Sequence, residues 1–203
     1  MVVALAVVAS ARPAAGSRDD VERTLHAASV LVGTGCSGVL AEGPDLVLTA
    51  KHCIEERQSV DLRFADGATR TGWVAAVDHV ADQALIVLEE PVAVEPLTLA
   101  RRPAIAGSVL YFEGRPSEAR FQEAKLDHVG TCPSLPRLQD ALFTTIAGVP
   151  GDSGAPIVDA GGHVVGLVHG GAQCQIATPA ETLLRLVERF LGNDKLELPV
   201  RGN

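Results

Sequence analysis

The chain has 203 residues, 47% of them apolar and 21% charged, which is typical of one or two globular domains. Its formal net charge of −8 at pH 7 argues against nucleic acid and anionic membranes as partners, because an acidic protein repels both. We therefore expect a globular protein that binds neither nucleic acid nor a membrane surface.

An apolar stretch, residues 1–11, opens the chain and ends in the small-x-small pattern Ala9-Ser10-Ala11. It is too short for a transmembrane helix, which needs about 20 residues, and it is typical of a secretory signal peptide. No basic residue precedes it, so the alternative is an apolar first strand that is retained. A signal peptide predicts a secreted or periplasmic protein, with residues 12–27 as a polar N-terminal segment.

Short apolar runs rich in Val, Ile and Leu follow, each bounded by Gly, Pro or Asp. Closely spaced strand and turn signals of this kind indicate an all-β barrel or sandwich. The predicted strands are Val30–Val32, Gly38–Ala41, Leu46–Thr49, Val60–Phe64, Trp73–Val77, Ala84–Leu88, Val109–Phe112, Ala141–Ile146, Pro156–Val158 and His163–Val168.

The C-terminal part has helical spacing instead. Leu, Val and Phe recur at helical intervals over residues 179–191, so we predict a helix that Thr178 could cap and Gly192 could end. Before it, the proline-containing stretch 89–106 is interpreted as the crossing between two similar β halves. We expect residues 194–203 to form a short tail with no further domain after it.

The most specific motif is G-D-S-G-A-P, around Ser153. A nucleophilic serine needs a tight turn that exposes its hydroxyl and points backbone N–H groups at a developing oxyanion. Glycines on both sides of the serine permit that backbone path. Taken alone, the string could also be an ordinary turn.

Two further motifs supply a base and an acid. L-T-A-K-H-C places His52 at a strand end. A serine hydroxyl is a weak nucleophile unless a base removes its proton, and histidine can act as that base. By itself, this histidine could equally be a structural neighbour of the cysteine. D-Q-A-L-I-V-L places Asp82 at the start of a buried strand, where it could accept the N–H of His52. Asp78 is the competing acid, but the apolar strand directly after Asp82 favours Asp82.

The three motifs, in the order His52, Asp82, Ser153, resemble the chymotrypsin/trypsin-like serine proteases, in particular bacterial members of that family. Subtilisin-like and α/β-hydrolase enzymes use other orders. The resemblance covers about residues 28–191, and we place a protease domain at 28–193. It implies two six-stranded antiparallel β-barrels with a C-terminal helix. It further implies a serine endopeptidase that forms an acyl-enzyme, with an oxyanion hole made by the N–H groups of Gly151 and Ser153.

The family pattern also concerns the four cysteines. The resemblance implies a disulfide between Cys36 and Cys53, which flank the strand pair that delivers His52. It also implies that the partner of Cys174 lies a few residues before the nucleophile, but this chain has no cysteine there. Cys132 remains, so a Cys132–Cys174 bridge and two free thiols both stay open. No C-x-x-C pair or H-E-x-x-H motif occurs, so we expect no metal and no cofactor.

The expected specificity pocket departs from the family pattern. Trypsin-like enzymes have an acid about six residues before the serine, whereas this chain has Ala147 followed by Gly148. A buried Lys or Arg side chain of a substrate would lack a partner there. His169 replaces a serine of the family, close to Gly171. Three possibilities stay open: a preference for Glu or Asp, a small apolar pocket, or a His169 that turns towards Asp82.

Activation and partners are the last expectations. Animal enzymes pair the acid beside the serine, here Asp152, with a new N-terminus, but no such peptide precedes Val30. No single arginine is identifiable from the sequence as its partner. We expect a monomer that acts on a protein or peptide substrate. A catalytically silent peptide-binding relative and an esterase are the rival functions, although the triad is complete and G-x-S-x-G is absent.

Overall fold

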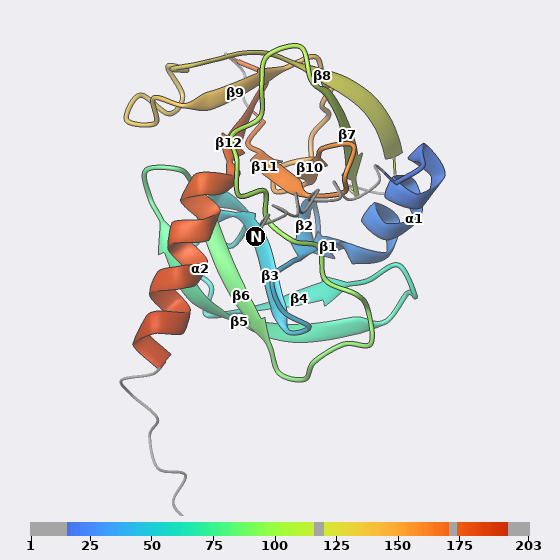
Figure 1. The fold of residues 1–203 in the computed structure, drawn as a ribbon. Coiled ribbons are helices and arrows are strands. Elements are labelled where there is room, and N and C mark those ends of the chain that lie inside the picture. The colour runs from blue at the N-terminus through green and yellow to red at the C-terminus, as the bar shows by residue number, and fades with distance from the viewer. Residues whose placement is uncertain (1–15, 116–119, 171–173, 195–203) are drawn as a thin grey trace, which may run out of the picture.

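Two closed antiparallel barrels follow one another along the chain in the computed structural model, which describes residues 16–115, 120–170 and 174–194 (Figure 1). The first barrel has the strand order β1-β2-β3-β6-β5-β4 and the second β7-β8-β9-β12-β11-β10, which is the same topology. The predicted all-β architecture of two six-stranded barrels with a C-terminal helix is confirmed.

The element bounds are as follows. The first barrel comprises β1 (Ser29–Val32), β2 (Cys36–Leu40), β3 (Leu46–Ala50), β4 (Ser59–Arg63), β5 (Thr69–Asp78) and β6 (Gln83–Leu88), with the 3₁₀ turn η1 (Lys51–Cys53) after β3. The second comprises β7 (Val109–Gly114), β8 (Arg120–Gly130), β9 (Ala141–Thr144), β10 (Pro156–Val158), β11 (Val164–Val168) and β12 (Ile176–Pro179). The helices are α1 (Arg18–Ala28) and α2 (Ala180–Asp194).

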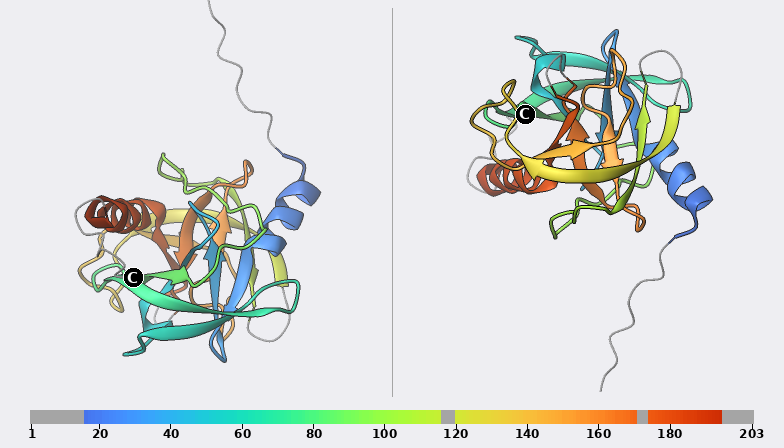
Figure 2. Two further views of the ribbon diagram at one scale, coloured as in Figure 1. Left: turned by 90° about the horizontal axis from the view of Figure 1, so that it is seen from below. Right: turned by 90° about the horizontal axis from the view of Figure 1, so that it is seen from above.

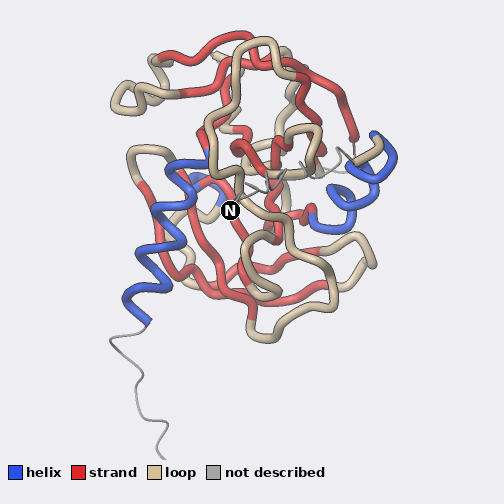
Figure 3. Tube along the Cα trace, in the orientation of Figure 1, coloured by secondary structure: helices blue, strands red, loops and turns tan. Residues whose placement is uncertain are grey.

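Two strands escaped the sequence analysis, β8 and β12. In β8 only Ala124 and Leu126 are buried, so the strand carries almost no apolar alternation. β12 is fully buried but has only four residues, and it leads directly into the C-terminal helix. No strand or helix lies between the end of β6 and the start of β7, the stretch in which the sequence analysis placed the crossing. It is part of the tan loop trace in Figure 3.

The C-terminal helix α2 packs against strands of both barrels, β5 and β6 in the first and β11 and β12 in the second (Figure 1). Its residues Leu183, Leu186 and Val187 are buried in the larger hydrophobic core, to which both barrels contribute. Both predicted helix ends need correction. Thr178 belongs to β12 and its hydroxyl accepts a hydrogen bond from Gln83 at 2.8 Å, while α2 continues through Gly192.

The N-terminal helix α1 was not predicted, and it lies on the side of the molecule opposite α2 (Figure 2). A capping box between Ser17 and Asp20 starts it. Its residues Val21 and Leu25 are buried in the larger hydrophobic core, which residues of both barrels form, so the folded unit begins ahead of residue 28. The predicted signal peptide, residues 1–11, and the tail after Asp194 lie outside the described residues. Among the described helices, none is long and apolar enough to cross a membrane.

Two disulfides cross-link the molecule. Cys36 is bonded to Cys53, which joins β2 to the turn that carries His52. Cys132 is bonded to Cys174, which joins the segment after β8 to the segment before β12. Both bridges agree with the sequence analysis, and the alternative of two free thiols is wrong.

A buried ionic cluster fastens α1 to the second barrel. The carboxylate of Glu113, at the end of β7, is only 2% exposed and lies 3.0 Å from Nδ1 of His26 and 3.1 Å from the guanidinium of Arg115. Arg115 also donates to the backbone carbonyl of His26 at 2.5 Å. Burial raises the pKa of Glu113, although Arg115 and His26 act in the opposite direction. The carboxylate therefore depends on these two partners to remain charged inside the fold.

Replacing Arg115 by Met should leave the Glu113 carboxylate without its strongest partner and lower the free energy of unfolding by about 3 kcal/mol. The double variant Glu113→Gln with Arg115→Met should recover part of that loss, because no buried charge then lacks its partner. Urea denaturation with the disulfides intact measures both values. Arg102→Met, at an exposed position, is the matched control, and an Arg115→Met variant as stable as this control would contradict the role given to the cluster.

Candidate active site

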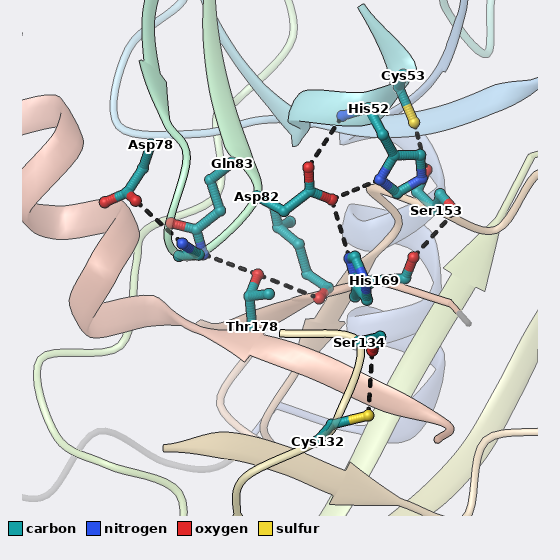
Figure 4. A network of polar contacts seen from close by, with 12 residues as sticks. His52, Cys53, Asp78, Asp82, Gln83, Cys132, Ser134, Ser153, His169 and Thr178 are labelled. Carbon is teal, nitrogen blue, oxygen red and sulfur yellow. Dashed lines mark hydrogen bonds and ion pairs between the residues drawn. The ribbon is translucent and has the colours of Figure 1, made fainter. Parts of the chain in front are cut away.

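The residues predicted to act together come from both barrels and meet where the barrels face each other (Figure 4). The first barrel contributes His52 from η1 and Asp82 from the residue that precedes β6. The second contributes Ser153 from the turn before β10 and His169 from the residue after β11. His52, Asp82, Ser153 and His169 line one open hollow of about 450 Å³.

Two hydrogen bonds join Asp82 to His52, and a third joins it to Lys51. Its backbone has a positive φ of 54°, a conformation that Asp tolerates better than most residues, and its carbonyl accepts the N–H of Lys51 at 2.8 Å. Oδ1 accepts the backbone N–H of His52 at 3.1 Å, and Oδ2 lies 2.5 Å from Nδ1 of the same histidine. The carboxylate therefore fixes both the position and the ring orientation of His52.

Asp78, the competing acid, has a different role. Its Oδ1 accepts the backbone N–H groups of Val80 and Ala81 at 2.8 and 3.0 Å, so it caps the turn after β5. The carboxylate also lies 3.7 Å from Arg189 of α2. The structure thus brings Asp82, and not Asp78, onto the imidazole of His52.

A second imidazole shares the Asp82 carboxylate. Nδ1 of His169 lies 2.9 Å from Oδ2 of Asp82. The rings of His169 and His52 are arranged edge to face, with centroids 5.4 Å apart and an interplanar angle of 87°. Nδ1 of His169 has no aligned hydrogen bond, so only its distance defines the contact with Asp82. Burial alone would raise the pKa of Asp82, but the two histidines outweigh it and hold that pKa well below its ordinary value. Asp82 therefore stays ionised far into the acid range.

Ser153 lies beside this pair of histidines. Its hydroxyl donates to the backbone carbonyl of His169 at 3.1 Å. Within the described residues it makes no hydrogen bond to His52, although both side chains line the same hollow. A change of the Ser153 side-chain rotamer is thus needed to bring its hydroxyl onto the base.

The turn that carries Ser153 rests on the first barrel through Ser37, a buried residue that the sequence analysis did not single out. The N–H of Ser37 donates to the carbonyl of Ser153, and its hydroxyl donates to the carbonyl of Gly151, both at 2.8 Å. In this turn the N–H groups of Gly151 and Ser153 have no acceptor among the described residues. Their N–H groups remain available for an oxyanion.

Gly154 permits this close approach of the two barrels. Its φ is +82°, and a Cβ there would lie 2.2 Å from the carbonyl oxygen of Ser37 and 2.4 Å from Oγ1 of Thr49. The glycine that the motif supplied is therefore required by backbone conformation and by packing against the first barrel.

Asp152 has the partner that the sequence did not reveal. Its carboxylate is 1% exposed, forms an ion pair with Arg120 at the start of β8, and accepts the backbone N–H of Val149 at 2.8 Å. Burial raises the pKa of Asp152, and the contacts with Val149 and Arg120 only partly offset this. Gly114 makes room for it, because a Cβ there would lie 1.9 Å from Oδ1 of Asp152. Arg120 was missed because β8 was not predicted as a strand.

A second pocket of about 290 Å³ opens beside Ser153. Its lining is mostly apolar or neutral, and consists of Thr144, Ile146, Gly148, Val149, Pro150, Asp152, Ser153, Val168, Gly170, Gln175 and Ile176. Among the residues predicted to form a specificity pocket, Gly148 lines this space. Ala147 does not, His169 faces Asp82 instead, and Gly171 lies outside the described residues.

Comparison with known proteins gave three similarities. The family model described as trypsin-like peptidase domain matches residues 36–167. The Synechocystis sp. protein named serine protease HhoB is 28% identical over 182 residues, which are 84% of this chain and 43% of that protein. The chain thus spans less than half the length of this curated relative. The crystal structure of the serine endoprotease from Yersinia pestis has the same fold, with a TM-score of 0.75, 18% identity, and coverage of 88% of this chain and 68% of that one.

Removing the partner of Asp152 should disturb the Ser153 turn. In Arg120→Met the buried carboxylate is left without a counter-charge, so we expect the Ser153 turn to shift. Labelling of Ser153 by a fluorophosphonate should then slow by about 100-fold, because a small displacement of a catalytic group lowers the rate by about this factor. Arg120→Lys should retain part of the rate because it keeps the charge. Lys125→Met, at an exposed position on the same strand, is the matched control. Equal labelling rates for Arg120→Met and Lys125→Met would show that the ion pair does not position the turn.

Proposed function

The chain belongs to the trypsin-like peptidase family and is a serine-type peptidase, and from this premise we propose that it cleaves internal peptide bonds through an acyl-enzyme on Ser153. The observation that carries the proposal is the contact of Asp82 with Nδ1 of His52, beside a Ser153 whose turn leaves two N–H groups available. In this arrangement the carboxylate holds the ring proton on Nδ1. Nε2 of His52 is then the nitrogen with a lone pair for the serine proton.

The reaction begins when Ser153 leaves the carbonyl of His169 and turns its hydroxyl to Nε2 of His52. As Oγ attacks the scissile carbonyl carbon, its proton passes to His52, and the ionised Asp82 stabilises the imidazolium that forms. The carbonyl oxygen becomes an oxyanion that accepts the N–H groups of Gly151 and Ser153. The C–N bond then breaks, and His52 gives its proton to the departing amine.

Hydrolysis of the acyl-enzyme repeats these steps with water as the nucleophile. His52 takes a proton from the water, the oxyanion forms again at Gly151 and Ser153, and the ester bond to Oγ breaks. Ser153 recovers its proton from His52. Each residue therefore returns to its starting state, and no cofactor takes part in these steps.

For the substrate we propose a protein or peptide with a medium-sized apolar side chain before the scissile bond. The pocket beside Ser153 is lined by Ile146, Val149, Val168 and Ile176, and its acidic residue, Asp152, is paired with Arg120. His169, which could have recognised an acidic side chain, faces Asp82 instead. The proposal includes action outside the cytosol, which two disulfides support.

Ser153→Ala should abolish both peptide hydrolysis and labelling by a fluorophosphonate. His52→Ala should lower kcat by a similar factor, because the same proton transfer is lost. Asp82→Asn should lower kcat by about 10⁴-fold, because an asparagine no longer keeps the ring proton of His52 on Nδ1. The same substitution of the acid has an effect of this size in chymotrypsin-like enzymes. Mass spectrometry of the labelled protein and kinetics on a casein-type substrate measure these effects. Asp78→Asn is the matched control, and a larger loss in Asp78→Asn than in Asp82→Asn would reverse the assignment of the acid.

A peptide library should show cleavage after Val, Leu, Met or Phe in preference to Glu, Asp, Lys or Arg. The physical reason is the cost of burying a charged side chain in a mostly apolar pocket without a free counter-charge. Cleavage sites read by mass spectrometry give the profile. His169→Ser should leave the order of preference unchanged, whereas a wild-type preference for Glu that this variant loses would restore the acidic alternative.

A further inference from the structure

Three metal-ligating groups converge at the triad. One ring nitrogen each of His52 and His169 and a carboxylate oxygen of Asp82 lie within 4.8 Å of one another. The carboxylate oxygen Oδ2 is the common point, 2.5 Å from Nδ1 of His52 and 2.9 Å from Nδ1 of His169. Two imidazoles and one carboxylate are a donor set that suits Zn²⁺.

The arrangement depends on the histidine at position 169. The family pattern has serine there, which would leave only His52 and Asp82 as ligands. The His169 ring is 12% exposed, and its Nδ1 is buried without an aligned acceptor among the described residues. This nitrogen is therefore poised at the carboxylate without being engaged in a regular hydrogen bond. Figure 4 shows dashed lines from the Asp82 carboxylate to both rings.

The three ligand residues line the open hollow, although Nδ1 of His169 itself is buried. The His52 side chain is 43% exposed, and the hollow in front of it opens to solvent, so an ion can enter and keep water as a fourth ligand. Lys51 and His79 line the same hollow. The ammonium of Lys51 opposes cation binding, which favours a reversible regulatory site over a permanent structural one. A second group, Cys36, His52 and Cys53, is no such site, because its cysteines form a disulfide.

We propose that His52, Asp82 and His169 bind Zn²⁺ or a similar divalent transition-metal ion, and that the bound ion reversibly switches off the peptidase; this effect rests on the proposed function. The ion takes the lone pair of Nδ1 of His52, so the ring proton moves to Nε2. An imidazole that was protonated gives its extra proton to solvent. With a proton on Nε2, His52 cannot accept the proton of Ser153, and the attack on the substrate cannot begin.

Inhibition is tested by titrating the wild-type protein with ZnCl₂ during peptide hydrolysis, followed by EDTA. We expect loss of activity that EDTA restores and that MgCl₂ and CaCl₂ do not reproduce, because those ions prefer oxygen ligands. Inhibition of His169→Ser is measured relative to that variant's own zinc-free rate. The zinc concentration for half inhibition should rise by more than about tenfold, since the loss of a residue that only supports a metal ligand already lowers metal affinity by this factor. His79→Ser, in the same hollow, should remain as sensitive as wild type. Equal sensitivity of wild type and His169→Ser would overturn the proposal.

Binding is tested separately from activity in Ser153→Ala, which retains all three ligands. Calorimetry should give one Zn²⁺ per chain, and Co²⁺ should give the intense visible absorption of a four-coordinate site. Both signals should disappear in Ser153→Ala with His169→Ser. If they are present but the wild type hydrolyses no peptide, the site stands and the proposed function fails. If wild type is an active peptidase but Ser153→Ala binds no zinc, the function stands and the metal site is wrong.

Discussion

The seating of the Ser153 turn on the first barrel is the contact on which the rest of the site depends. Neither barrel holds the complete set of groups, so their alignment decides whether the serine, the histidine and the acid meet. Ser37 provides that alignment with two hydrogen bonds of 2.8 Å, to the carbonyls of Ser153 and Gly151. Gly154 allows the backbones to approach closely enough for both. The N–H groups of the same two peptide units, those of Asp152 and Gly154, donate to the carbonyls of Val149 and Val168, so these two peptide units are fixed on both sides.

Buried carboxylates hold the elements around this contact. Asp152 anchors the Ser153 turn to β8 through Arg120, and Glu113 joins α1 to the end of β7 through Arg115 and His26. Such pairs add little net stability, because removing both charges from water costs about as much as their attraction returns. Their value lies in geometry, since a buried carboxylate tolerates few positions other than the one beside its partners. The ionic contacts therefore define where α1 and the turn sit.

Asp82 differs from these two acids because two imidazoles share it. One of them, His52, has the position of a general base, while His169 adds a second nitrogen to the same oxygen. The pKa of Asp82 is accordingly held low, and the carboxylate keeps its charge for the imidazolium of the reaction. The same charge and the same two nitrogens form the donor set of the proposed zinc site. Catalysis and its inhibition would thus draw on one carboxylate.

The two six-stranded barrels were implied by the resemblance to a known family. The sequence by itself determined the all-β class, most of the strands, the C-terminal helix and the order of the three motifs. These features are local, because apolar alternation, turn glycines and a serine flanked by glycines act within a few residues. Only the tertiary structure decided the partner of Asp152, the direction of His169 and the docking of α1. Arg120 lies 32 residues from Asp152 on a strand with almost no apolar alternation, so no local pattern connects them. Contacts between distant segments depend on how the two barrels pack, and that packing is set by the whole chain.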